Sequence, residues 1–528
     1  MHEIQNVLIL IACVAILSPV ATRLGMAEPI LFVLGGLVLG LVPRFPALPL
    51  DPEVIFFLFL PPLLFLQAYF TSWREFRRNL RPIGLLAVGL VLFTSAGVAV
   101  LCRLLIPGMS LAEGFVLGGI VSPPDAVAVA AVARRLRLPR RLVVILEGES
   151  LVNDASGLVV LKFALAALAT GRFSASEASL RFLWVAAGGI GIGMGIGWAL
   201  SRIFHRIEDD SLAVLVSLLV PFAAYFPAEH LGVSGVLAVV AAGLWIGWEI
   251  SGRIRFSIRI KGNATWRTVE YLLNGLIFLM IGMQIRFVFA DLRSDFGVLE
   301  LLGYGAAVSL AVILLRPIWV YPITHLQRRI FPSLARRDPT PPPGAIAVLS
   351  WAGIRGVVSL AAAMALPRSL PGGIPFLNRD LILFLTFCVI LSTLVLQGLT
   401  FPALVRRLGV REAADEAEES RVARDHLLAA GLQAVDRTAR EESLDAETAK
   451  EVLLEYQRRR SNLRDGLVEA LGWSPERHRL LTRRRLEEAA LHAQRLELQR
   501  LRRVGELPEE LRLHLENELD LEEARLRS

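Results

Sequence analysis

The chain consists of a succession of apolar segments, each long enough to cross a lipid bilayer. Windows of about 17 to 25 residues, the length of a transmembrane helix, occur thirteen times before residue 405. They are centred near Ile16, Leu37, Leu60, Val91, Val121, Asp154, Ile190, Val216, Ala241, Phe278, Val312, Gly356 and Ile390. Because the hydrocarbon core supplies no water to bond backbone groups, such segments must fold as helices. The sequence therefore predicts an all-α membrane protein with about 13 transmembrane helices.

Composition divides the 528 residues into two parts. Residues 1–405 are apolar segments with short polar breaks and form the predicted transmembrane domain. Residues 406–528 are dense in Arg, Glu and Leu, and leucines recur at three- and four-residue intervals in LEEAALHAQRLELQRLRR. This spacing predicts a helical tail outside the membrane. A regulatory or dimer-supporting tail and a plain solvated appendage are both compatible with it.

The basic residues of the predicted short loops fall mainly on one side of the membrane. Counting Lys and Arg gives 21 on that side and 8 on the other. The richer side is cytoplasmic by the positive-inside rule, which places the tail inside and the N-terminus outside the cell membrane. The same bias explains the net charge of +7, so we expect a lipid bilayer and no nucleic acid as partner.

Cysteine usage argues against a disulfide framework or a zinc site. Cys13, Cys102 and Cys388 all lie inside apolar segments and lack the spacing of metal ligands. We therefore expect no resident cofactor.

Two of the thirteen predicted spans are interrupted. In the fifth, Pro123 and Pro124 remove backbone donors and obstruct the preceding turn. In the twelfth, Gly353 and Gly356 flank Arg355, where a helix can unwind. The two spans are seven apart, as expected if spans one to six and eight to thirteen are inverted six-helix repeats with the seventh as connector. Paired interruptions at equivalent positions, here crossing helices, point to the binding site of a transporter.

The sixth span carries polar residues that membrane burial makes expensive. Each charged group at the bilayer centre costs roughly 2.5 to 3.5 kcal/mol on insertion scales, so such groups usually mark an ion or proton path. Glu147, Ser150 and Asp154 are spaced i, i+3 and i+7 and share one helix face, while Glu149 and Asn153 share a neighbouring face. The first face suits a cavity and the second suits contacts with other helices.

A small monovalent cation fits the cavity face. The Asp154 carboxylate and the Ser150 hydroxyl supply oxygen ligands, and Asp125 of the interrupted fifth span can add another, so the sequence predicts a Na+ site at these three residues. Burial penalises the charged form of a carboxylate. A proton and a cation therefore compete for Asp154.

Few basic residues lie deep inside the predicted spans. They are Lys162, Arg316 and Arg355. A buried charge normally has a partner, so we expect Glu149 to pair with Arg316 and Arg355 to neutralise helix ends at the crossing. An exchange of these roles between the two arginines is the alternative. Lys162 is expected to reach outward.

Several segments of the chain resemble the first cation/proton antiporter family, which includes bacterial sodium/proton antiporters and the animal sodium/proton exchangers. The likeness covers nearly the whole membrane domain in the same order. It is carried by SPPDAVAV (122–129), GESLVNDASGLV (148–159), GIRGVVSLA (353–361), FLPPLLFLQAYFTSWREFRRN (59–79) and FLMIGMQI (278–285).

The resemblance implies roles for residues of the sixth span and of the first interruption. Asp154 would hold the cation and the proton in turn, with Asn153 as its structural neighbour and Ser150 as a ligand, and Asp125 would be a carboxylate at the crossing. The Asn-Asp pair is similar to the branch that exchanges one cation for one proton without net charge movement.

The resemblance also implies a scaffold and an assembly. Glu149 with Arg316 would be the buried pair, Arg355 the charge of the second interrupted helix, and the protein a homodimer. The activity implied is alternating-access exchange of Na+, or of Li+ or K+, for H+, in sodium transport and pH homeostasis. The implied protein is not an enzyme.

The chain departs from the family pattern at two places. Leu66 and Gln67 stand where many relatives have an acidic residue, and Pro124, Asp125 and Ala126 stand in place of Thr-Asp-Pro. Both changes remove a ligand that the family pattern offers, and Gln67 is the candidate substitute.

Three alternatives stay open from the sequence. One is a K+/H+ antiporter of the same family. A second is an intramembrane hydrolase that uses Asp125 and Asp154 as an acid/base pair. A third is a channel on the same scaffold, whose ion flux would not be coupled to protons.

Overall fold

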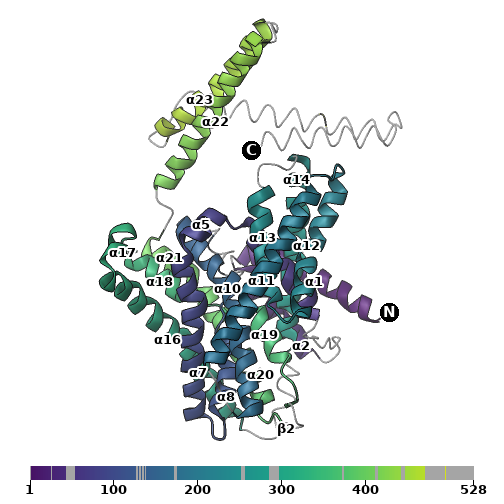
Figure 1. Cartoon of the computed structure of the whole chain (residues 1–528), viewed down its shortest axis with the longest axis vertical. Coiled ribbons are helices and arrows are strands. Elements are labelled where there is room, and N and C mark those ends of the chain that lie inside the picture. The colour runs from purple at the N-terminus through teal and green to yellow at the C-terminus, as the bar shows by residue number, and fades with distance from the viewer. Residues whose placement is uncertain are drawn as a thin grey trace. The chain divides into compact units, whose positions relative to one another are not determined.

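A computed structural model of the chain shows a helical protein (Figure 1). The described residues are 2–24, 26–42, 54–125, 129, 133, 136, 138–171, 175–250, 256–284, 297–370, 374–410, 414–441, 446–469 and 494. Contacts divide the chain into two compact units, Met1–Glu412 and Ala413–Ser528. The predicted boundary between residues 405 and 406 lies inside the last helix of the first unit.

The first part of the membrane unit is a series of helices. Three short segments of the whole unit, labelled η, are π-helical. In chain order the elements are α1 (His2–Leu24), α2 (Glu28–Leu41), η1 (Ile55–Phe59), α4 (Leu60–Phe70), α5 (Trp73–Arg78), α6 (Leu80–Gly84), η2 (Leu85–Leu90), α7 (Val91–Leu105), α8 (Leu111–Val121), α10 (Arg140–Thr170), α11 (Ala175–Phe204) and α12 (Asp210–His230). Helices α7, α8 and α10 pack side by side, together with the later helix α16 (Val298–Ile330) (Figure 1).

The second part of the chain continues in the same manner. Its elements are α13 (Gly235–Ile250), α14 (Phe256–Met283), α16 (Val298–Ile330), α17 (Pro332–Arg337), α18 (Pro343–Trp351), α19 (Val357–Met364), β1 (Ser369–Leu370), β2 (Ile374–Pro375), α20 (Arg379–Ser392), η3 (Thr393–Gln397), α21 (Gly398–Leu408), α22 (Ala414–Glu441) and α23 (Ala446–Glu469). The strands pair antiparallel, with Ser369 opposite Pro375 and Leu370 opposite Ile374. This short pair is a departure from the all-α prediction.

Among the described residues, seven helical stretches are long and apolar enough to cross a membrane. They are Gln5–Leu24, Leu80–Leu105, Arg140–Thr170, Ser179–Phe204, Asp210–His230, Val298–Ile330 and Arg379–Leu408. Shorter apolar helices include Glu28–Leu41, Leu111–Val121 and Gly235–Glu249. The predicted class, a helical membrane protein, is confirmed, while the count of thirteen spans and the inverted repeats stay predictions.

Local sequence signals explain where the helices nearest the site begin and end. At the start of α8, Ser110 Oγ accepts from the Glu113 backbone N–H at 3.2 Å, and Glu113 Oε2 accepts from the Ser110 N–H at 2.7 Å. This capping box satisfies donors that a helix start leaves open. Helix α10 ends at Thr170 and is followed by Gly171, which has a positive φ of 68°, a conformation that glycine adopts without steric cost.

The core of the membrane unit is apolar but contains two large charged side chains that are fully buried. Aliphatic and aromatic side chains such as Phe278, Phe384 and Leu360 are fully buried. Among the residues whose burial is described, however, the two largest fully buried side chains are Arg316 and Arg355. A guanidinium removed from water must find hydrogen-bond partners, so these arginines lead directly to the site.

The tail unit contains two helices that pack against each other, α22 and α23. Arg460 of α23 donates two hydrogen bonds to Asp425 of α22, at 2.7 and 2.8 Å. The bond to Asp425 raises the pKa of Arg460 above its ordinary value. The predicted helical tail is thus present over residues 414–441 and 446–469.

Candidate ion-binding site

The polar residues of the predicted sixth span lie on one continuous helix, α10. Their exposed fractions are 7% for Asp154, 5% for Ser150, 1% for Glu149 and 0% for Asn153. Ser150 and Asp154 are four residues apart and so share a face. The structure thus buries both a carboxylate and a hydroxyl side by side along α10, as an ion site requires.

The first interruption lies where α8 ends at Val121. Pro123 and Pro124 have no N–H and cannot continue the hydrogen bonds of the helix. The carbonyl groups of Val121 and Ser122 instead accept from the Arg355 side chain, from Nε at 2.9 Å and from Nη2 at 3.3 Å. Arg355 therefore places a positive charge at the negative end of the α8 helix dipole.

The second interruption separates α18, which ends at Trp351, from α19, which begins at Val357. Arg355 lies in this gap, where its side chain also donates to the Gly353 carbonyl and its N–H donates to Thr393 Oγ1 at 3.1 Å. The two interruptions meet directly, because the Asp125 N–H donates to the Ile354 carbonyl at 2.7 Å. Residues more than 200 positions apart thus form one polar centre.

Asp125 packs against the start of α19. A Cβ atom added to Gly356 would lie 1.9 Å from Asp125 Oδ2, so only glycine leaves room for the carboxylate. Gly356 precedes the first turn of α19, where the positive end of a helix dipole favours a negative charge. Asp125 directly follows Pro124, whose carbonyl accepts from Asn153, the chain neighbour of Asp154. The two carboxyl-bearing residues therefore belong to the same polar centre.

Asn153 joins α10 to the first interruption. Its Nδ2 donates to the Pro124 carbonyl at 2.7 Å, and the residue is completely buried. Within the described part of the chain, its Oδ1 has no hydrogen-bond partner. Asn153 therefore satisfies a carbonyl that the broken helix leaves without an intrahelical donor.

Close packing of α8 on α10 depends on Gly157. A Cβ atom there would lie 2.3 Å from Pro123 Cγ and 2.8 Å from the Gly119 carbonyl oxygen. Small residues let helix backbones approach closely in membranes. The absence of a side chain at Gly157 therefore lets the end of α8 pack closely against the turn of α10 that carries Asp154.

Glu149 and Arg316 form a buried pair with two parallel hydrogen bonds. Arg316 Nη1 donates to Oε1 at 2.6 Å and Nη2 to Oε2 at 2.7 Å, and the two side chains are 0% and 1% exposed. Arg316 Nε also donates to the Leu349 carbonyl of α18 at 3.0 Å. In the structure Arg316 pairs with Glu149, and Arg355 bonds to the helix ends. These contacts agree with the expected assignment and not with the exchanged one.

Other predicted residues lie away from these contacts or play smaller parts. Lys162 is exposed, in keeping with a side chain that reaches outward. Leu66 is buried and apolar, and Gln67 is half-buried on α4 with its Oε1 unbonded in the described structure. Ala126 lies outside the described residues.

Sequence reasoning missed three contributors. Ser95 Oγ donates to Ser122 Oγ at 3.1 Å, Thr393 accepts from Arg355, and Gly356 accommodates Asp125. Gly356 was noted only as a possible point of unwinding. A serine or threonine in an apolar span carries no signal of its own, because either often bonds to its own helix.

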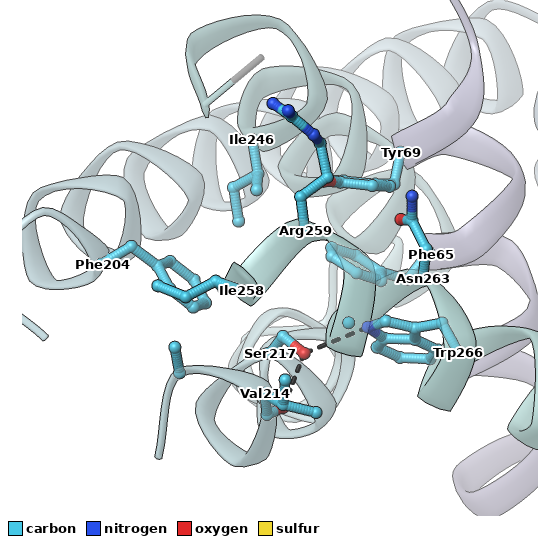
Figure 2. A pocket seen from close by; sticks show the side chains of 12 residues that line it. Phe65, Tyr69, Phe204, Val214, Ser217, Ile246, Ile258, Arg259, Asn263 and Trp266 are labelled. Carbon is cyan, nitrogen blue, oxygen red and sulfur yellow. Dashed lines mark hydrogen bonds between the residues drawn. The ribbon is translucent and has the colours of Figure 1, made fainter. Parts of the chain in front are cut away.

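A small cavity beside α4 is distinct from this centre. Figure 2 shows aromatic side chains around it, including Phe65 and Trp266, whose Nε1 donates to Ser217 Oγ at 3.0 Å. Its volume is about 50 Å³, enough for a few water molecules. We interpret it as a packing gap between α4, α12 and α14.

Comparison with known proteins decides the family. The family model for the transmembrane sodium/hydrogen exchanger matches residues 9–407. The chain belongs to this family. Members transport monovalent cations and protons across membranes, so the interrupted helices and buried carboxylates lie in a member of the sodium/hydrogen exchanger family.

Individual relatives agree with this assignment. An uncharacterized Na+/H+ exchanger of Mycobacterium tuberculosis strain H37Rv is 35% identical over 523 residues, covering 98% of this chain and 95% of the relative. The sodium, potassium, lithium and rubidium/H+ antiporter of Bacillus subtilis is 34% identical, covering 87% of this chain and 69% of the relative. These names give no support to the hydrolase alternative.

The fold also has a solved counterpart. The sodium proton antiporter of Methanocaldococcus jannaschii, determined at pH 8, aligns with a TM-score of 0.59 at 19% identity and covers 77% of this chain and 99% of that one. At this identity the likeness concerns the fold alone.

Proposed function

We propose that this exchanger moves one Na+ against one H+ by alternating access, with Asp154 as the carboxylate that both substrates use. The observation that carries the proposal is the meeting of the two interruptions at Asp125, which directly follows the Pro124 carbonyl bonded by Asn153, the neighbour of the buried Asp154. A buried carboxylate is stabilised by a positive charge. A cation or a proton can supply it.

The cation site comprises Asp154, Ser150 and Asp125. Two carboxylates and a hydroxyl are oxygen donors, which hard cations prefer. Asn153 contributes an amide that does not titrate and is bonded to the Pro124 carbonyl. With Asp154 alone exchanging a proton for a cation, each cycle moves no net charge.

The scaffold around the site is held by the buried arginines. Glu149 with Arg316 ties α10 to α16 and, through the Leu349 carbonyl, to α18. Arg355 compensates the carbonyl ends of α8. On this scaffold we propose thirteen spans in two inverted repeats of six, with α8 and the α18–α19 pair as the crossing helices.

The proposed setting is the cell membrane, with the N-terminus outside and the tail in the cytoplasm. It rests on the excess of basic residues in the loops on one side. We further propose a homodimer, as the resemblance to the antiporter family implies.

K+/H+ exchange is the second candidate. It is favoured by the Bacillus subtilis relative, whose name includes potassium and rubidium, and by the apolar Leu66 where many family members carry an acid. A site with fewer charged ligands is less selective for a small ion.

Everted membrane vesicles with a preformed pH gradient test the proposal. Adding Na+ should collapse the gradient, and adding K+ measures the second candidate in the same assay. Asp154→Asn should abolish the response, whereas Asp380→Asn, at a half-exposed carboxylate paired with Arg379, should leave it intact. Full activity in Asp154→Asn would overturn the mechanism. Ion flux without a pH change would indicate a channel.

A further inference from the structure

A cavity of about 510 Å³ lies between η2, α10, α16, α18 and the end of α21. Its apolar part consists of Leu86, Ile145, Val320 and Ile346, which form a buried cluster. The cavity lies beside the loops whose arginines mark the proposed cytoplasmic side. It is distinct from the ion site, because neither Asp154 nor Asp125 lines it.

The lining of the cavity carries a net positive charge. It contains Arg81, Arg141 and Arg328 against one carboxylate, Asp338, so three positive charges and one negative charge leave two positive charges. Arg141 and Arg328 both bond to Asp338, at 2.7 and 2.9 Å. Arg81 lies over the ring of Phe331 with its guanidinium carbon 5.8 Å from the ring centre. An anion would compensate the excess charge.

The outer face of α16 indicates what kind of anion fits. Ile318, Leu326 and Ile330 of this helix are 56%, 49% and 58% exposed, as expected of a surface that contacts lipid chains. The cavity face of the same helix runs from Val320 to the charged Arg328. A ligand here meets arginines at one end and aliphatic side chains at the other.

We propose that this cavity binds an anionic phospholipid, with the phosphate headgroup at the arginines and an acyl chain against the apolar cluster. Basic pockets between membrane helices on the cytoplasmic side bind such headgroups. The apolar cluster favours a lipid over a soluble phosphate, because burying hydrocarbon contributes to the binding of a lipid only.

The lipid would touch two functional parts of the membrane unit. Leu349 of α18 lines the cavity, and its carbonyl accepts from Arg316, the partner of Glu149. Gly409 and Val410, which also line it, precede the tail. Occupancy therefore stabilises the helix that carries the second interruption and the point where the tail leaves the membrane unit.

Binding to the purified full-length chain tests this inference without any transport measurement. Native mass spectrometry and thermal unfolding in detergent would compare phosphatidylglycerol, phosphatidylcholine and inorganic phosphate. Phosphatidylglycerol should bind and raise the unfolding temperature more than either of the others. Equal effects of the two lipids would overturn the role of charge, and an equal effect of phosphate would show a site for soluble anions instead.

Variants of two charged residues that line the opening of the cavity, Arg81 and Asp338, which we call the rim variants, should change the lipid affinity in opposite directions. Arg81→Gln removes one exposed charge and should weaken phosphatidylglycerol binding about fivefold, whereas Asp338→Asn adds net positive charge and should strengthen it by a similar factor. Arg103→Gln, at a basic residue in the last turn of α7, is the matched control and should bind as the unaltered chain does. Unchanged affinity in both rim variants would refute the site.

Discussion

The membrane unit and the tail each contain an arginine that bonds one carboxylate through two parallel hydrogen bonds. Arg316 meets Glu149 at 2.6 and 2.7 Å, and Arg460 meets Asp425 at 2.7 and 2.8 Å. Arg316 uses its two Nη atoms and Arg460 its Nε and Nη2, so both pairs are bidentate at similar distances, but the surroundings differ. The first two side chains are 0% and 1% exposed, and the second two are 31% and 24% exposed.

This difference shows that burial, more than distance, decides what a pair contributes. In the tail, water can replace either partner, so the pair adds little to stability. Inside the membrane unit water cannot replace either partner. Each buried charge would therefore be left uncompensated without the other. The buried pair can thus fix the register of α10, which carries the proposed ion site, against α16 and α18.

The largest expected effect comes from breaking the buried pair. Arg316→Leu leaves Glu149 as an uncompensated charge and should cost about 3 to 5 kcal/mol of unfolding free energy. Chemical denaturation of the detergent-solubilised chain measures it. The double variant with Glu149→Leu should recover part of the loss, because no buried charge then remains. A loss no greater than that of Arg460→Leu would contradict the comparison.

The next effect concerns the space around Asp125. Gly356→Ala places a methyl group where Asp125 Oδ2 lies, so the carboxylate must move and Na+/H+ exchange should fall about 100-fold. Initial rates in everted vesicles measure this. Gly262→Ala on α14 is the control, because nothing lies within 4 Å of the added Cβ. Normal exchange in Gly356→Ala would show that Asp125 need not occupy this position.

A smaller effect is expected at Asn153. Asn153→Leu removes the donor to the buried Pro124 carbonyl and should cost about 1 to 3 kcal/mol, the penalty for an unsatisfied buried group. Denaturation under the conditions used for Arg316→Leu gives the value. Asn153→Gln keeps an amide and serves as the matched variant. Equal unfolding free energies of the unaltered chain, Asn153→Leu and Asn153→Gln would mean that the hydrogen bond from Asn153 to the Pro124 carbonyl contributes nothing to stability.

The smallest effect is expected in the tail. Arg460→Leu should leave vesicle exchange unchanged and only slightly increase the rate of proteolysis between α22 and α23. High salt should have the same effect on the unaltered chain, because at 1 M the screening length is about 3 Å. A large loss of exchange in Arg460→Leu would show that the tail pair supports transport and would remove the contrast with Arg316.

The sequence was sufficient for features that depend on local pattern. Apolar windows predicted the helices, and Pro123 with Pro124 and Gly353 with Gly356 predicted the two interruptions. Helical spacing placed Ser150 and Asp154 on one face. These predictions succeed because helix formation, helix breaking and the helix period each depend on a few neighbouring residues.

Contacts between distant segments were decided only by the tertiary structure. The sequence favoured the pairing of Glu149 with Arg316 but left an exchange with Arg355 open, and the bonds that decide between them span 167 and 234 positions. Nor did it show that Gly356 makes room for Asp125, or that Thr393 receives the Arg355 N–H. Sequence alone determined a helical membrane protein with two interrupted spans and with carboxylates inside its apolar segments. Packing decided their partners, because a buried charge is stabilised by whichever group the fold brings within hydrogen-bond reach.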